Sequence, residues 1–257
     1  MPVYKASISL AESASLLQLF TVLGSHPISL FTHTKLDLSV YQKLLIGKAY
    51  QIIYFDEFFF KDTASYSKLL CSKIFYKEFK KFKFLLIYQL DAWVFKDELN
   101  YWCSQNYDYI GAPWFSKNEQ DDLVFEAVGN GGFSLRNVKS HLRVLNSFSF
   151  TEKPGYVYYL LKKTYSIKKS ISILIEFLFY KNTHYLFNGF QENEDRFWSM
   201  IAFRNFKWFK TPSKELALKF SIEVYPSYFI DTESDLPFGC HAWEKYDRVF
   251  WNKFIKI

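Results

Sequence analysis

The sequence contains little cysteine. Only three cysteines occur in 257 residues, at positions 71, 103 and 240, and no two stand at the spacing Cys-x-x-Cys. A disulfide framework and a structural zinc site are therefore not expected, and a reducing compartment fits this composition.

The chain also lacks a strong charge of either sign. Lys and Arg exceed Asp and Glu by six, and these charges are spread along the sequence. This excess is too small to predict nucleic-acid binding, but it suits an anionic ligand such as a nucleotide diphosphate, or an acidic membrane surface. The N-terminus has no basic flank before an apolar core, so we expect no signal peptide. Residues 13–34 are uncharged but are interrupted by Gly24, His26 and Pro27, so they do not predict a membrane span.

Aromatic residues, in contrast, are abundant. They make up 21% of the chain, with 29 Phe and 19 Tyr. This composition excludes disorder as a global description, and the length is enough for one large domain with a real core. No repeat, linker or low-complexity segment divides the chain, which predicts a single domain over residues 1–257.

Helical and strand patterns alternate through the first half. A capping box at Ser9 and Glu12 predicts a helix that ends at Gly24. Strands are predicted over residues 27–32, 50–55, 84–90 and 107–112, the last of them ended by Pro113. Helices are predicted over residues 64–79 and, later, 192–203. This order predicts an α/β fold with a mixed, mostly parallel central sheet flanked by helices.

The most informative acid is Asp91, which ends the apolar run Phe84–Leu90. Ligands gather at the carboxyl ends of strands in open α/β sheets, so Asp91 is a candidate ligand for Mg²⁺ or Mn²⁺. The alternative is a helix cap or a buried acid paired with a lysine.

Three further clusters allow two readings each. The Gly-rich segment 129–134 either lets a backbone approach a ligand or makes a tight turn. The acids of segment 192–195 either cap a helix or provide a general base. His241, between Gly239 and Trp243, is either structural or a metal ligand.

The order of these clusters resembles that in glycosyltransferases of the A-type (GT-A) fold, in particular an uncharacterised bacterial domain family associated with surface-polysaccharide genes. Five segments carry the resemblance: 88–95 (YQLDAWVF), 107–115 (YDYIGAPWF), 129–136 (GNGGFSLR), 193–198 (NEDRFW) and 237–243 (PFGCHAW).

The resemblance implies roles for individual residues. Asp91 and His241 would bind a divalent cation, Mn²⁺ or Mg²⁺, although Trp93 stands where such enzymes carry a second acid. Asp195, or its neighbour Glu194, would be the catalytic base. The remaining residues implied to bind the nucleotide sugar, together with Asp91 and Trp93, are Pro2, Tyr4, Tyr66, Lys68, Gly131, Gly132 and Ser134.

The implied activity is transfer of a sugar from a nucleotide-diphosphate sugar to an acceptor hydroxyl, with inversion, in synthesis of a capsule, O-antigen or lipooligosaccharide. If neither acid reaches the acceptor, a retaining mechanism stays open. The acceptor would be a glycan or a lipid-linked acceptor, and the location would be cytoplasmic, at the inner face of the cell membrane. The alternatives are a non-catalytic carbohydrate- or nucleotide-binding subunit, a nucleotide-sugar hydrolase and a nucleotidyltransferase.

Residues 150–185 are predicted to form a helical insertion in which lysines alternate with aromatic and aliphatic residues. The insertion is either a helical hairpin packed on the core or a surface that faces an acceptor or an anionic membrane.

Overall fold

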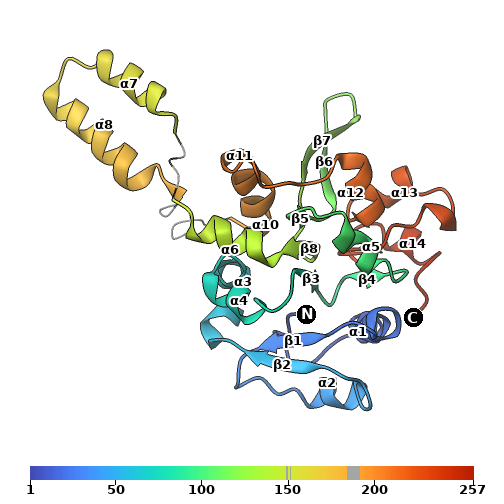
Figure 1. Cartoon of the computed structure of the whole chain (residues 1–257). Helices are drawn as coiled ribbons and strands as arrows, with labels where there is room; N and C mark the ends of the chain where they lie inside the picture. The colour runs from blue at the N-terminus through green and yellow to red at the C-terminus, as the bar shows by residue number, and fades with distance from the viewer. Residues whose placement is uncertain (149, 151, 184–191) are drawn as a thin grey trace.

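The computed structural model describes residues 1–148, 150, 152–183 and 192–257 (Figure 1). Its helices are α1 Leu10–Leu23, α2 Ser39–Leu44, η1 Glu57–Phe60, α3 Thr63–Leu70, α4 Lys73–Glu78, α5 Leu99–Ser104, α6 Val138–Asn146, α7 Pro154–Lys162, α8 Ile167–Tyr180, α10 Glu194–Arg196, η2 Phe197–Ala202, α11 Phe203–Asn205, α12 Lys214–Phe220, α13 Pro226–Phe229, η3 Glu233–Asp235 and α14 Arg248–Trp251. Its strands are β1 Ser29–Thr32, β2 Gln51–Tyr54, β3 Phe84–Tyr88, β4 Trp93–Val94, β5 Tyr109–Ile110, β6 Pro113–Lys117, β7 Leu123–Val128, β8 Phe133–Asn137, β9 Ser221–Ile222 and β10 Gly239–Cys240. The molecule is α/β, as predicted.

The first helix confirms the predicted capping box. The hydroxyl of Ser9 accepts a hydrogen bond from the N–H of Glu12, and the Glu12 carboxylate accepts one from the N–H of Ser9. These contacts satisfy donors that the first helical turn leaves without partners. The helix ends before Gly24, and strands β1 and β2 follow as a parallel pair.

The expectation of a mostly parallel central sheet is wrong for the strands that carry the candidate site. Strand β8 pairs antiparallel with β3 on one side and with β5 on the other. Strand β7, which leads into β8 through the short Gly-rich turn, belongs to a separate two-stranded sheet with β6. A strand covered on both faces gives an apolar run in either orientation, so the run of residues 84–90 could not reveal this direction.

A β-hairpin occupies the position where Pro113 was expected to end a strand. Strand β5 stops at Ile110, and Pro113 instead begins β6, which pairs antiparallel with β7. Proline is tolerated there because the first residue of a strand can do without a ladder hydrogen bond.

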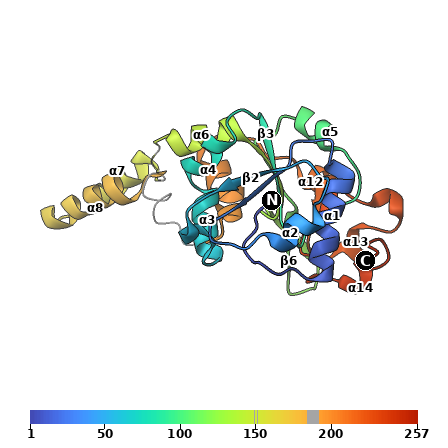
Figure 2. The ribbon, with the colours of Figure 1, turned by 90° about the horizontal axis from the view of Figure 1, so that it is seen from below.

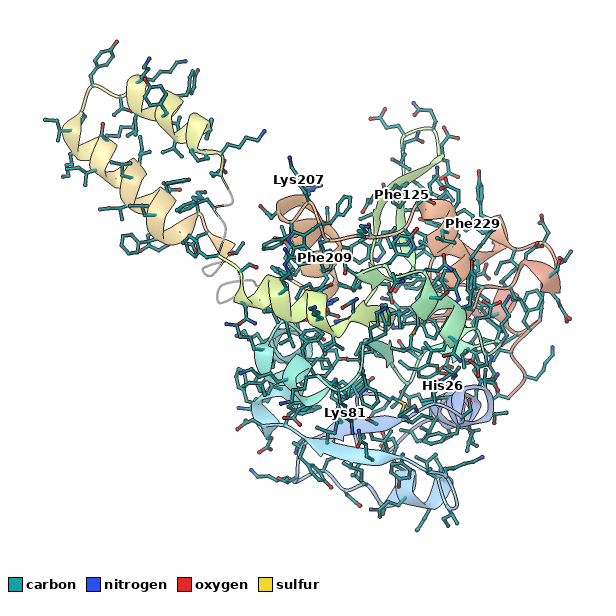
Figure 3. All side chains as sticks on the ribbon, in the orientation of Figure 1. His26, Lys81, Phe125, Lys207, Phe209 and Phe229 are labelled. Atoms are coloured by element: carbon teal, nitrogen blue, oxygen red, sulfur yellow. The ribbon has the colours of Figure 1, made fainter. Side chains whose placement is uncertain are left out.

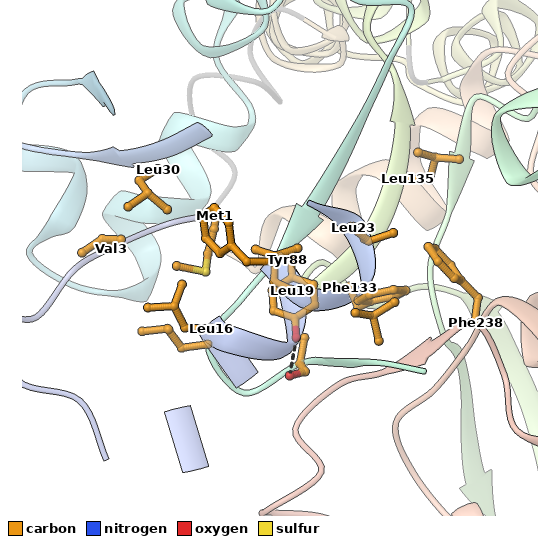
Figure 4. Packing of buried hydrophobic residues seen from close by; sticks show 14 of the residues in the cluster. Met1, Val3, Leu16, Leu19, Leu23, Leu30, Tyr88, Phe133, Leu135 and Phe238 are labelled. Carbon is orange, nitrogen blue, oxygen red and sulfur yellow. Dashed lines mark hydrogen bonds between the residues drawn. The ribbon is translucent and has the colours of Figure 1, made fainter. Parts of the chain in front are cut away.

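Three apolar clusters form the core. The first lies between α1, β1 and β3, and joins Leu16 and Leu19 to Tyr88 and Phe133 (Figure 4). Within it, the Tyr88 hydroxyl lies 3.1 Å from that of Ser15, so this buried tyrosine keeps a hydrogen-bond partner.

The two helices of the predicted insertion, α7 and α8, project from the body as an arm in both views of the ribbon (Figures 1 and 2). Residues 151, 184 and 185 of the expected insertion lie outside the described residues. The expected helix over 192–203 consists of α10, the π-helical segment η2 and the start of α11. In the described part of the chain, no helix is long and apolar enough to cross a membrane.

Candidate functional site

Two cavities in the body differ in character. One, of about 490 Å³, lies between α1, β1, β3 and α5 and has a mainly apolar lining. The other, of about 450 Å³, is lined mainly by polar groups. Its lining residues are Thr63, Tyr66, Ser67, Gln89, Trp114, Phe115, Glu126, Asn130, Gly131, Gly132, Asn193, Glu194, Asp195, Arg196, Met200, Glu223, Val224, His241, Lys245 and Tyr246. Convergent ionisable groups make this second cavity the candidate site.

The Gly-rich turn between β7 and β8 is held by the side chain of Asn130. This residue has a φ of 56°, in the left-handed region that asparagine tolerates better than most residues. Its amide oxygen accepts hydrogen bonds from the N–H groups of Gly132 and Phe133, at 3.0 and 3.3 Å. Its amide nitrogen therefore points the other way, to within 2.9 Å of Nδ1 of His241.

Gly131 and Gly132 lie against the two halves of the site. A Cβ on Gly131 would lie 2.2 Å from Oε1 of Glu194 and 3.3 Å from Cβ of Asp195, whereas a Cβ on Gly132 would lie 1.9 Å from Nε2 of His241. No side chain fits at either position without displacing these groups. Because consecutive Cα atoms are about 3.8 Å apart, one turn brings the acid pair and the histidine together.

Glu194 is committed to a buried ion pair. Its two carboxylate oxygens accept hydrogen bonds of 2.9 and 2.7 Å from the guanidinium of Arg136, and the Arg136 side chain has no solvent exposure. The hydroxyls of Tyr76 and Ser134 also contact this guanidinium. Burial raises the pKa of Glu194 to about 7, although Arg136 opposes that rise, while the same pair raises the pKa of Arg136. Arg136 therefore stays charged, and its guanidinium engages both carboxylate oxygens of Glu194.

Asp195 lines the cavity and makes no ion pair with Arg136. It is half-buried, and its oxygens accept hydrogen bonds from the N–H groups of Gly131, at 3.2 Å, and Arg196, at 2.8 Å. Burial raises the pKa of Asp195 above its ordinary value, and these two hydrogen bonds only partly oppose it. A carboxylate that is oriented by the backbone and has a raised pKa is suited to general-base chemistry.

His241 connects the turn to two acids. Nε2 lies 3.2 Å from Oδ1 of Asp91 and 3.2 Å from Oε1 of Gln89, and Nδ1 lies 3.1 Å from Oε1 of Glu223. Burial alone would lower the pKa of His241, but Asp91 and Glu223 outweigh burial and raise it to about 10.

Asp91 has an incompletely satisfied carboxylate. Its Oδ1 is buried and accepts no hydrogen bond from the described residues, although Nε2 of His241 lies within ion-pair distance. Burial raises the pKa of Asp91, but the neighbouring His241 outweighs this and lowers it below the ordinary value. Oδ1 of Asp91 thus faces a charged imidazolium, and a cation held by both residues would take the place of the proton on Nε2 of His241.

The donor set near Asp91 fits a divalent cation that shares its coordination with a substrate. Oδ1 of Asp91 and Nε2 of His241 are adjacent, and Mg²⁺ or Mn²⁺ often takes one or two protein ligands together with substrate phosphates. Among the residues that the structure describes, no group of three or more His, Cys, Asp and Glu side chains is placed to hold a metal ion by itself.

The predicted residues divide into those that line the cavity and those that do not. Tyr66 lines it beside Gln89, and burial raises the pKa of Tyr66. Tyr4 is 45% exposed; its partial burial and, after that, the charge of Asp91 raise its pKa to about 12. Tyr4 therefore lies near the Asp91 side of the site.

Asp91 and Tyr4 are not among the residues that line the cavity, and four further predicted binding residues also lie outside its lining. Pro2 is buried beside Phe31, and exposed Lys68 lies over the ring of Phe58. Ser134 is fully buried, where its hydroxyl bonds to Gly131 and Arg136. Trp93 packs against Trp243 in the third apolar cluster. In the position where a second acid was expected, the chain has a core residue.

Sequence reasoning missed Gln89 and Glu223. Gln89 stands two residues before Asp91, so its motif already contained the signal. Glu223 follows the two-residue strand β9, which has no recognisable period, and only pairing with β10 brings it beside His241.

A comparison with protein families gives one match, over residues 49–241, to a family described as "Protein of unknown function (DUF5672)". No curated protein and no solved structure matches the chain. The matched range contains Asp91, the Gly-rich turn, Asp195 and His241. Because that range covers about three quarters of the 257 residues, the chain belongs to this family.

Proposed function

We propose that this protein is a glycosyltransferase that moves a sugar from a nucleotide-diphosphate sugar to an acceptor hydroxyl. The observation that carries the proposal is the meeting of two chemically different halves in one cavity. Asp195 lies against Gly131 on one side of the turn, and His241, with Asp91 beside it, lies against Gly132 on the other.

The size and charge of the cavity support this substrate class. A volume of about 450 Å³ is within the range of small-molecule sites. Its lining carboxylates, which include Glu126, Asp195 and Glu223, can accept hydrogen bonds from sugar hydroxyls. Arg196 and Lys245 supply positive charge at the same cavity. A diphosphate in this acid-rich surrounding would gain from a further cation.

Asp195 is the proposed general base. The N–H groups of Gly131 and Arg196 fix its carboxylate, so its orientation does not depend on the bound acceptor. Asp195 would accept the proton of the acceptor hydroxyl as that oxygen attacks the sugar carbon. Attack on the face opposite the leaving diphosphate gives inversion.

Asp91 and His241 are the proposed ligands of a divalent cation, Mn²⁺ or Mg²⁺, which would neutralise charge on the diphosphate leaving group. Glu223, whose Oε1 lies 3.1 Å from Nδ1 of His241, would orient the ring through the nitrogen that does not bind the cation. Glu194 has a different role: with Arg136 it fixes the position of α10 and hence of Asp195.

The proposal is tested by assaying nucleotide sugars with Mn²⁺, with and without a glycan acceptor. Replacing Asp195 by Asn should lower transfer by about 10²–10⁴-fold, because the base is lost, while nucleotide binding stays close to that of the wild type. Glu192→Gln is the matched control and should keep the transfer rate of the wild type. Glu192 belongs to the same segment as Asp195, but its side chain is exposed and forms an ion pair with Arg196. Wild-type rates in Asp195→Asn would contradict the role of Asp195.

The same assay separates the other candidates. A hydrolase would release the sugar without an acceptor, and a binding subunit would bind nucleotide sugar with no turnover. Trp93, in place of a second acid, favours the binding subunit as second candidate. Removal of divalent cations by chelation should abolish both transfer and tight diphosphate binding if Asp91 and His241 hold a cation.

We further propose that the reaction belongs to surface-polysaccharide synthesis at the cytoplasmic side of the membrane.

A further inference from the structure

The arm, residues 153–181, makes little contact with the body of the protein. Helix α8 has no buried residue, and α7 has one, Val157. Figures 1 and 2 show both helices extending away from the rest of the chain, and Figure 3 shows their side chains spreading outward. The arm is therefore not the core-packed hairpin that its apolar content also allowed.

One face of α8 is an exposed apolar stripe. Its members recur at the spacing of a single helical face, and their exposed fractions lie between 42% and 80%. They are Ile167, Ile171, Leu174, Ile175 and Leu178. Ile173 and Phe177 lie on a different face and are half-buried. The ring of Phe177 stacks on that of Phe150, with 4.3 Å between the ring centroids. The stripe is thus distinct from the face that α8 uses for packing.

The tip of the arm combines lysines with two exposed apolar side chains. Tyr165 is fully exposed and Ile167 is 80% exposed. Two lysines precede them, at 162 and 163, and two follow, at 168 and 169, with no acid between. The whole arm has six lysines and one glutamate, so it carries five of the six net positive charges of the chain. Nearly all of the charge imbalance of the protein lies on the element that projects furthest.

We propose that the arm docks the protein on an anionic lipid surface. The stripe of α8 and Tyr165 would enter the boundary between headgroups and acyl chains, and the tip lysines would lie among the headgroups. A membrane fits better than a second copy of the chain, because two arms that each carry five net positive charges repel each other. This proposal goes beyond the transfer reaction and does not depend on it.

The test is co-sedimentation of the full chain with vesicles of neutral phosphatidylcholine, or of phosphatidylcholine with about a third phosphatidylglycerol, in 0.1 M salt. We expect binding to the anionic vesicles and little to the neutral ones. Each lysine near an anionic surface raises the partition coefficient between vesicle and water by roughly fivefold. The variant K162Q/K163Q/K168Q/K169Q lacks four such lysines, so it should bind on the order of 10²–10³-fold more weakly.

The chain offers a matched control on the body. Lys73, Lys77, Lys80 and Lys81 are exposed, and the variant K73Q/K77Q/K80Q/K81Q removes the same charge from the α4 region. This control should bind like the wild type. A second variant, I171S/L178S, should weaken the binding that survives in 0.5 M salt, where headgroup attraction is screened.

Three results would overturn the proposal. One is absence of binding to anionic vesicles by the wild type. Another is an equal loss of binding in the two quadruple variants, which would assign the attraction to charge in general. The third is a dimer in solution that I171S/L178S dissociates, since the stripe would then be covered by a second copy.

Discussion

The cavity and the arm depart from the usual distribution of side chains in opposite directions. In the cavity, a guanidinium and a carboxylate are buried at Arg136 and Glu194. On the arm, aliphatic side chains such as Ile167 and Ile171 are exposed. Buried charges and exposed apolar patches are the two departures that carry information, because scattered exposed apolar residues are common.

The difference lies in how the two regions are compensated. Arg136 contacts Glu194, Tyr76 and Ser134, so this buried ion pair is satisfied inside the fold. The stripe of α8 has no partner among the described residues of the body. The site is therefore complete as a structure and ready for a ligand, whereas the arm requires a second surface.

The largest effect on stability should come from breaking the buried pair. Glu194→Met leaves Arg136 charged and buried, and Arg136 cannot release its proton, so unfolding free energy should fall by about 3–5 kcal/mol. Arg136→Met should cost less, because loss of the guanidinium raises the pKa of buried Glu194 further and the carboxylate can take up a proton. Urea denaturation at pH 6 and pH 8 measures both variants, and the loss in Arg136→Met should be smaller at pH 6.

The double variant R136M/E194M sharpens this comparison. Replacing both partners by apolar side chains of similar size removes the unpaired charge and should restore most of the stability. A double variant as unstable as Glu194→Met would show that the hydrogen bonds to Tyr76 and Ser134 matter more than the ion pair.

Replacing Asp195 should change stability by less than breaking the buried pair does, and it should increase stability rather than lower it. Burial raises the pKa of Asp195 above 3.8, so its contribution to stability is present below pH 3.8 and is lost as pH rises through the raised pKa. Asp195→Asn should therefore melt at a higher temperature than the wild type at pH 7. The difference in melting temperature between Asp195→Asn and the wild type should shrink as pH falls towards 3.8. A difference that is independent of pH would exclude the charge of Asp195 as its cause.

The smallest effect on folding is expected on the arm. Ile171→Ser removes an apolar side chain that is already 52% exposed, so unfolding free energy should change by no more than about 0.5 kcal/mol. The buried counterpart is Leu16 of α1, which has no exposure; Leu16→Ser should cost about 2–5 kcal/mol. A large loss from Ile171→Ser would mean that the stripe packs on the protein itself.

The sequence predicted local elements better than their pairing. The capping box of α1 and the strands β1 and β2 follow from side-chain chemistry within a few residues, and the structure confirms them. The hairpin of β6 and β7 was missed because Pro113 was taken as a terminator. The direction of β8 was also missed, since an apolar strand reads alike in either orientation.

The candidate site was also predicted from the sequence only in part. The order of motifs singled out Asp91, Gly131, Gly132, Asp195 and His241, and the structure brings these five residues together. The sequence did not distinguish Glu194 from Asp195. Both open one helix and line the cavity, and only the position of Arg136 on β8 commits one of the two carboxylates to an ion pair.

The amino-acid order by itself determined which chemical groups are available: the acid after the apolar run of β3, two small residues in a turn, an acid pair at a helix start and a basic, apolar insertion. Tertiary structure alone decided which of these groups meet and which stay apart. Contacts such as Arg136 with Glu194, or Glu223 with His241, join residues from distant strands and loops, and no local pattern encodes the distance between them.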